Sequence, residues 1–145
     1  MKINLDMDGT FVNLYGVNDW LSYLIAENVF PYVAAKPLIN LSVFARLLNK
    51  LQKKGYEINI ISWCSKNGTT QYNQAVIEAK KKWLRKHLPS VKFDNLYIVP
   101  YGTSKNLFNS GMDILFDDEA RNRDEWTGTA YTQDEIFEIL RELAA

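Results

Sequence analysis

Short apolar runs that alternate with longer amphipathic stretches constrain the fold of this 145-residue chain more than any other feature. Runs of four to seven residues that end at turn or polar residues predict buried strands, and a 3.6-residue apolar period predicts helices. The predicted strands are Lys2–Leu5, Glu57–Ser62, Leu96–Val99 and Asp113–Asp117, and the predicted helices lie at 38–54, 69–87, 106–108 and 133–143. Such an alternation predicts an α/β fold, with a parallel sheet covered by helices on both faces.

Residues 12–37 interrupt this alternation. The stretch holds five of the nineteen aromatic residues of the chain and is broken by Pro31 and Pro37. We therefore expect a small helical insertion, at about residues 13–37, over the end of the first strand. Because 145 residues match the usual size of one domain, the sequence predicts a single domain, residues 1–145, that carries this cap-like insertion.

The charges cancel over the whole chain but are unevenly distributed along it. Residues 36–105 carry thirteen Lys and Arg against three Asp and Glu, whereas residues 113–145 carry three against ten. The zero net charge gives no reason to expect a strongly charged partner. Carboxylates at Asp6 and Asp8 stand where a signal peptide would be apolar, and no apolar run could span a membrane. We expect a cytoplasmic protein with no membrane partner, and the sequence gives no oligomeric state.

Polar side chains gather at the ends of the predicted strands. Asp6 and Asp8 follow the first strand, Ser62 ends the second, Lys105 precedes the fourth, and Asp117 and Asp118 follow it. Because the carboxyl ends of parallel strands meet at one edge of a sheet, we expect these groups to lie in one crevice. Carboxylates held this close repel one another and call for a cation. Mg²⁺, a hard ion that takes oxygen ligands, suits them.

The order of these residues resembles that of a known family. Leu5–Phe11 reads Leu-Asp-Met-Asp-Gly-Thr-Phe and matches the DxDGT signature of the haloacid dehalogenase (HAD) superfamily phosphatases. Ser62, Lys105 and the Asp117–Asp118 pair follow in the family's order, so the resemblance extends from residue 2 to about residue 118. It implies a three-layer, Rossmann-like fold of the HAD type with a small cap or none, and a nucleotidase-like phosphomonoester hydrolase.

The resemblance also implies roles for individual residues. Asp6 would be the nucleophile that forms an aspartyl-phosphate, and Asp8 the general acid and base, with a raised pKa. Ser62 and Lys105 would bind the phosphate. These residue types suit that chemistry independently, because a carboxylate can attack a phosphoryl group and a second carboxyl group can protonate the leaving oxygen.

For the metal, the resemblance implies that Asp118 binds Mg²⁺ together with the Asp6 carboxylate and the Asp8 carbonyl. Asp117 would lie outside the direct metal ligands or contact the ion through a water molecule. The family commonly has Gly-Asp at this point, and the Asp-Asp form found here leaves the division of labour between Asp117 and Asp118 open.

The sequence lacks the residues that several other kinds of catalytic and binding site require. His87 is the only histidine, which excludes a histidine-based triad and a multi-histidine zinc site. Cys64 is the only cysteine, so no intrachain disulfide forms, and Thr70 stands where the cysteine phosphatases carry an arginine. Gly102–Lys105 looks like part of a phosphate-binding P-loop, but in an alignment on Lys105 the two P-loop glycines are replaced by Val99 and Ser104.

The short insertion predicts a partly open site, which leaves the substrate undetermined. Trp63, Tyr15 and Trp20 could contact a substrate by stacking on a base, or the latter two could form the insertion's own core. The basic run around Lys80, Lys81 and Lys82 could bind a polynucleotide, but the solvated face of a helix is the favoured interpretation. We expect a small phosphorylated substrate, such as a nucleotide; a polynucleotide-end 3′-phosphatase and a non-catalytic phosphate-binding protein are the alternatives.

Overall fold

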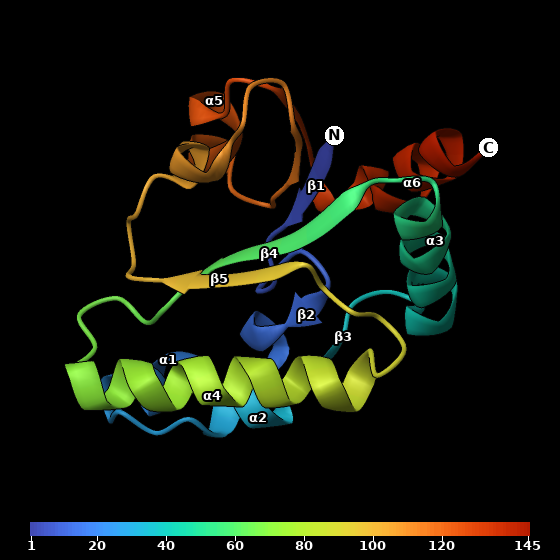
Figure 1. Cartoon of the computed structure of the whole chain (residues 1–145). Helices are drawn as coiled ribbons and strands as arrows, with labels where there is room; N and C mark the ends of the chain where they lie inside the picture. The colour runs from blue at the N-terminus through green and yellow to red at the C-terminus, as the bar shows by residue number, and fades with distance from the viewer.

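Five parallel strands form the central sheet, in the order β5-β4-β1-β6-β7, of which Figure 1 labels β5, β4 and β1. In the computed structural model, which describes residues 1–145, these strands are β1 (Lys2–Leu5), β4 (Glu57–Trp63), β5 (Asn95–Val99), β6 (Ile114–Phe116) and β7 (Thr129–Tyr131). The four predicted strands are confirmed within one residue at each end. The edge strand β7 was not predicted, because three residues are too short to show an apolar period.

The chain forms nine helical segments, and the two capping residues that the sequence indicates, Thr69 and Thr132, precede two of them. The segments are η1 (Leu14–Gly16), α1 (Trp20–Ile25), α2 (Phe30–Ala34), α3 (Leu41–Lys53), α4 (Thr70–His87), η2 (Lys105–Phe108), α5 (Ala120–Glu125), η3 (Gln133–Glu135) and α6 (Ile136–Ala144). The Thr69 side chain caps α4 by accepting a hydrogen bond from the Tyr72 N–H, and Thr132 and Glu135 form a capping box before α6. The final helix therefore opens as predicted, with a 3-10 turn as its first part.

Helical segments cover both faces of the sheet, which confirms the predicted α/β fold. Alternate strand residues point to opposite faces. Ile3, Ile60 and Phe116 pack in the main core with residues of α3, α4 and α6, whereas Ile61 and Leu115 pack on the other face against Trp126. In Figure 1, α4 and α5 accordingly lie on opposite sides of the sheet.

The strand order places a crevice beside β1. The chain proceeds from β1 outward to β4 and β5, and then returns to the other side of β1 to form β6 and β7. In open α/β sheets, ligands bind beyond the carboxyl ends of the strands at such a switch point. Leu5 pairs with Phe116, so the next residues, Asp6 and Asp117, face this crevice from neighbouring strands.

The segment that interrupts the strand–helix alternation forms its own small unit beside α4. Strands β2 (Val12–Asn13) and β3 (Lys36–Pro37) pair as an antiparallel ribbon, and residues 14–35 fold as η1, α1 and α2 between them. Leu14 and Tyr32 of this unit share an apolar cluster with Val76 of α4. Figure 1 shows α1 and α2 next to α4. None of the helices in the chain has the length and apolar character needed to span a membrane.

Candidate active site

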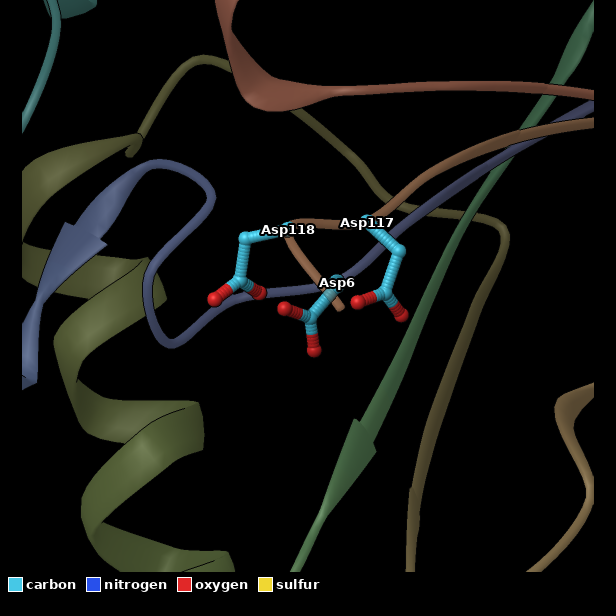
Figure 2. Close-up of side chains that lie close together, drawn as sticks. All are labelled: Asp6, Asp117 and Asp118. Carbon is cyan, nitrogen blue, oxygen red and sulfur yellow. The ribbon is translucent and has the colours of Figure 1, made fainter. Parts of the chain in front are cut away.

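Three of the predicted carboxylates meet in the crevice between β1 and β6. One oxygen from each of Asp6, Asp117 and Asp118 lies within 4.8 Å of the others, and Figure 2 shows the three side chains directed toward one another. Asp6 comes from the loop after β1, and the other two come from the loop after β6. The sequence-based expectation that these strand ends meet is therefore confirmed by the geometry.

Lys105, at the start of η2, lies between two of these carboxylates. Its Nζ donates to Asp6 Oδ1 at 2.8 Å and to Asp117 Oδ2 at 2.7 Å, and the side chain is 2% exposed. Burial alone would lower the pKa of Lys105, but the two carboxylates hold it above its ordinary value. Lys105 is therefore a charged ammonium group inside the crevice.

A tight turn after β1 holds the next residues of the predicted motif. Gly9 has a φ of +80°, and a Cβ at this position would collide with the Asp118 carboxylate. The fully buried Thr10 hydroxyl donates to Asp6 Oδ2 at 2.8 Å and accepts from the Asp118 N–H at 3.2 Å. Thr10 thus links the loops after β1 and β6, a role that the sequence analysis did not assign to it.

Lys80 is the main surprise of the site. The interpretation of its basic run as a solvated helix face is wrong for this residue, whose side chain is 2% exposed. Its Nζ donates to Asp8 Oδ2 at 2.8 Å, to Ser62 Oγ at 2.7 Å and to the Trp63 carbonyl at 2.7 Å. Ser62 and Lys80 lie on the α4 side of the sheet, whereas Asp6 and Lys105 lie on the η2 side.

The spacing of apolar residues in α4 could have revealed Lys80. Val76, Trp83 and Leu84 are buried and stand four residues before, three after and four after Lys80, so all share one helix face. Lys82, Arg85 and Lys86 are exposed, as predicted for a solvated face. A lysine on the apolar face of a helix is a signal for a buried partner.

Burial and mutual repulsion shift the pKa values of the carboxyl groups. Burial raises the pKa of Asp118 to about 8 and that of Asp117 to about 6, and in both cases the negative charge of Asp6 adds to the shift. Burial would also raise the pKa of Asp6, but Lys105 and hydrogen bonds from neighbouring groups hold it below its ordinary value. For Asp8, burial raises the pKa, and Lys80 offsets only part of this effect.

This set of groups fits a divalent cation. Each of the three carboxylates offers an oxygen where they meet, and the raised pKa of Asp118, caused first by burial, is raised further by the negative charges of Asp6 and Asp117. Both Asp117 oxygens already accept hydrogen bonds, from Lys105 and Asn122 at Oδ2 and from the Glu119 N–H at Oδ1. The Asp8 carboxylate lies outside the cluster and pairs with Lys80.

A cleft of about 550 Å³ extends from these carboxylates. Its lining includes Asp6, Asp8, Ser62 and Lys105, and the three predicted substrate contacts Tyr15, Trp20 and Trp63. Tyr15 and Trp20 meet edge to face at 4.9 Å. Side chains of α1, among them Leu21 and Ile25, form an apolar wall. The insertion thus covers one side of the cleft.

The comparisons with known proteins agree with this geometry. A family model described as "5′ nucleotidase, deoxy (Pyrimidine), cytosolic type C protein" matches residues 22–139. The crystal structure of D,D-heptose 1,7-bisphosphate phosphatase from Burkholderia thailandensis is similar in fold, with a TM-score of 0.51 and 14% identity over 85% of this chain and 69% of that chain. No curated protein matches the chain. The family match spans most of the chain, which therefore belongs to the cytosolic type C 5′ nucleotidase family and is a phosphatase of the HAD superfamily.

Proposed function

We propose that this phosphatase is Mg²⁺-dependent, forms an aspartyl-phosphate on Asp6 and hydrolyses the phosphomonoester of a nucleotide or of a small phosphorylated metabolite. The observation that carries the proposal is a pair of carboxylates two residues apart, each bonded to its own buried lysine, at the switch point of the sheet. Two such groups with different pKa values suit the nucleophile and the general acid of phosphoryl transfer.

Asp6 is suited to attack phosphorus. Its lowered pKa keeps it ionised, and Lys105 and Thr10 fix one oxygen each. A carboxylate oxygen forms the new bond to phosphorus while the bond to the leaving oxygen breaks, which gives an acyl phosphate on Asp6. Water then attacks that phosphorus, releases phosphate and regenerates the Asp6 carboxylate.

Asp8 is suited to move the proton in both steps. Its pKa is raised by burial, so it can hold a proton and deliver it to the leaving oxygen. The resulting carboxylate can then take a proton from the attacking water. Lys80 lies 2.8 Å from Asp8 Oδ2 and stabilises the ionised form between the two steps.

Cations and hydroxyl groups around the crevice can bind the transferred phosphoryl group. Ser62 and Lys105 line the cleft with Asp6 and Asp8, and donors of this kind stabilise charge that develops in the transition state. Lys80 donates its three hydrogen bonds to Asp8, Ser62 and the Trp63 carbonyl, so it positions Asp8 and Ser62. Asp118 and Asp6 would hold Mg²⁺, which supplies positive charge against the phosphoryl oxygens. We place Asp117 behind Asp118, because Asp117 is fully buried and accepts three hydrogen bonds, from Lys105, Asn122 and the Glu119 N–H.

The dimensions and lining of the cleft support a small substrate. Cavities of about 300–1,000 Å³ are typical for small ligands, and this cleft is about 550 Å³. Tyr15 and Trp20 offer flat surfaces for a base, and the matched family is described as a nucleotidase family. Together these features favour a nucleoside 5′-monophosphate over other phosphomonoesters.

The decisive experiment measures phosphate release from nucleoside 5′-monophosphates and phenyl phosphate, with Mg²⁺ and with EDTA. We expect the Asp6→Asn and Asp8→Asn variants to lose at least about 10³-fold in kcat, since residues that act as a unit are each essential. Asp124→Asn, at an exposed position in α5, is the matched control and should behave as the wild type. Full phosphate release by Asp6→Asn would contradict the proposal.

A polynucleotide end is the second candidate substrate. The exposed Lys82, Arg85 and Lys86 on α4 favour it, whereas the covering of the cleft by α1 disfavours it. A 3′-phosphorylated oligonucleotide should be the poorer substrate and show a weak dependence on salt. A strong preference for it that falls steeply with salt would establish the second candidate instead.

A further inference from the structure

One wall of the cleft carries two neighbouring aromatic rings with a lysine at each end of the row. The Lys105 Nζ lies 5.5 Å from the centre of the Trp63 ring, the Trp63 and Tyr101 rings lie 4.8 Å apart, and the Lys66 Nζ lies 5.8 Å from the centre of the Tyr101 ring. All four residues line the cleft. The row therefore leads from the carboxylate cluster, where Lys105 is bound, to an exposed cation in the loop between β4 and α4.

The middle of this wall is fixed in position. The Trp63 indole N–H donates to the Thr103 carbonyl at 2.8 Å, and the Arg121 guanidinium lies 5.8 Å from the centre of the same ring. The Thr103 hydroxyl in turn donates to the Pro100 carbonyl at 2.7 Å, a hydrogen bond within the loop after β5. A wall held by such bonds can position the body of a substrate without reordering first.

Lys66 differs from the other cations of the site because it has no carboxylate partner within 4.0 Å. Lys105 is neutralised by two aspartates, and Arg121 pairs with Glu125 at 3.4 Å. Of the glutamates that line the cleft, Glu27 accepts hydrogen bonds from Thr69, and Glu119 directly follows Asp118 in the loop after β6. The charge of Lys66 is therefore available to a ligand.

We propose that Lys66 binds a second anionic group of the substrate, so that, of two otherwise identical phosphomonoesters, the enzyme favours the one whose leaving group carries another phosphate or a carboxylate. This inference rests on the proposed function, because the scissile phosphate must lie at Asp6. The Trp63 and Tyr101 rings would contact the body of the substrate between its two anionic groups. A lysine ammonium is a point charge on a flexible stem, so it accepts phosphate and carboxylate groups over a range of lengths.

The experiment compares matched substrates that differ only in the second anion. The pairs are phenyl phosphate with 4-carboxyphenyl phosphate, and a nucleoside 5′-monophosphate with its 3′,5′-bisphosphate. We expect Lys66→Glu to lower kcat/KM for the second member of a pair by at least about tenfold, mostly through KM, because attraction becomes repulsion. The first member should change by less than about twofold. Lys82→Glu, an exposed charge reversal on α4 outside the cleft, should affect neither.

The outcomes separate this inference from the proposed function. An equal effect of Lys66→Glu on both members of each pair, or no effect on either, would overturn the role of Lys66. An effect on only one kind of second anion, phosphate or carboxylate, identifies the group that is bound. If the wild type hydrolyses nothing, the proposed function fails. Calorimetric binding of the same pairs to Asp6→Asn, with and without Lys66→Glu, then decides the role of Lys66 without turnover.

Discussion

Lys80 and Lys105 place two positive charges inside the molecule, each 2% exposed and each beside a carboxylate. A buried charge is tolerated when it is paired and fully hydrogen-bonded. Lys80 meets this condition, because its three N–H groups have three acceptors on Asp8, Ser62 and Trp63. The same ammonium group therefore supports the fold and sets the charge around the proposed general acid.

Replacing Lys80 by methionine should impair both activity and stability. We expect kcat to fall by about 10²-fold or more, since the charged partner of Asp8 and the hydrogen bond that orients Ser62 are lost together. Unfolding free energy should fall by about 3 kcal/mol at neutral pH, because the Asp8 carboxylate is left buried without its cation. Phosphate release and urea denaturation measure the two effects. Lys81→Met, on the partly exposed neighbour, is the control, and wild-type kinetics of Lys80→Met would contradict its assigned role.

The metal-free protein should lose stability as the pH rises from about 4 to about 8. The pKa of Asp118 is about 8 and that of Asp117 about 6, above the ordinary value of 3.8, so the folded state binds more protons than the unfolded state in this window. Mg²⁺ should therefore raise the melting temperature more at pH 8 than at pH 5. Thermal denaturation with Mg²⁺ and with EDTA checks this, and Asp118→Asn should remove most of the pH dependence. A Mg²⁺ effect that is the same at both pH values would count against the cation site.

The residues found from the sequence are those that belong to a compact motif or end an apolar run. Asp6, Asp8 and Gly9 lie within four residues of one another, and the strand ends predict the meeting of Asp6 with Asp117. Lys80 was missed because its neighbours in the sequence are exposed lysines, so that only its place on the helix distinguishes it. The contact that defines it is made with residues 18 and 72 positions away, a distance that no local pattern spans.

At the scale of elements, the insertion is attached to α4 by hydrogen bonds at the first turn of that helix. The Glu27 carboxylate accepts from the Thr69 N–H at 2.8 Å and from the Thr69 hydroxyl at 2.9 Å, and the Tyr72 hydroxyl donates to the Asn28 carbonyl at 2.9 Å. Glu27 also lines the cleft, directly after the apolar wall of α1. These bonds hold the wall in place over the carboxylates.

Removing this attachment should weaken substrate binding more than chemistry. In Glu27→Ala, we expect KM for a nucleoside 5′-monophosphate to rise several-fold while kcat changes by less than about twofold, because the wall of α1 is no longer held. Unfolding free energy should fall by about 1 kcal/mol through the lost hydrogen bonds. Glu78→Ala, at an exposed position on α4, is the control. A fall in kcat with KM unchanged would show that Glu27 acts on the chemical step instead.

The elements themselves were largely predictable, because each carries its signal locally. Helix α4 begins at Thr70, directly after its capping residue Thr69, and β4 is rich in β-branched residues. By contrast, β7 exists because Asp117 and its neighbours offer an open sheet edge, for example through the Asp117 N–H that donates to the Tyr131 carbonyl. Strand β7 pairs with β6 and with the residue that follows it, so β7 is specified by the sheet and not by its own three residues.

At the scale of the whole molecule, a row of asparagines crosses the interior of the sheet. Asn4, Asn59 and Asn95 are in register on β1, β4 and β5. The Asn59 amide donates to Asn4 Oδ1 at 3.1 Å, and the Asn95 amide donates to Asn59 Oδ1 at 3.0 Å. Because a shift of one residue would turn these groups to the other face, the row fixes the register of three strands.

Replacing the central member of the row should therefore destabilise the fold. In Asn59→Leu, the Asn4 carbonyl and the Asn95 amide lose their partner, and we expect a loss of about 1–3 kcal/mol in unfolding free energy. Urea denaturation measures the effect, and Asn18→Leu, at an exposed position before α1, is the control. Unchanged stability of Asn59→Leu would mean that water replaces the lost bonds.

The uneven distribution of charge along the chain is resolved by folding. Lys80 and Lys105 of the basic segment bind Asp8, Asp6 and Asp117, and Lys54 donates to the carbonyl of Ala145 at 2.7 Å. In the crevice the two segments thus meet at Lys105 and Asp117, whereas the other paired carboxylates, Asp6 and Asp8, come from the beginning of the chain. Composition alone could not show this, because it gives the number of charges and not their pairing.

The β2–β3 ribbon brings the two chain ends of the insertion together. Asn13 and Lys36 are paired neighbours, so the chain leaves and re-enters the core at nearly the same place. We therefore expect that replacing residues 14–35 by a longer or differently shaped segment leaves Asp6 and Asp8 in position. Over evolution, substrate preference can then diverge through changes in this segment, while the catalytic carboxylates are inherited unchanged.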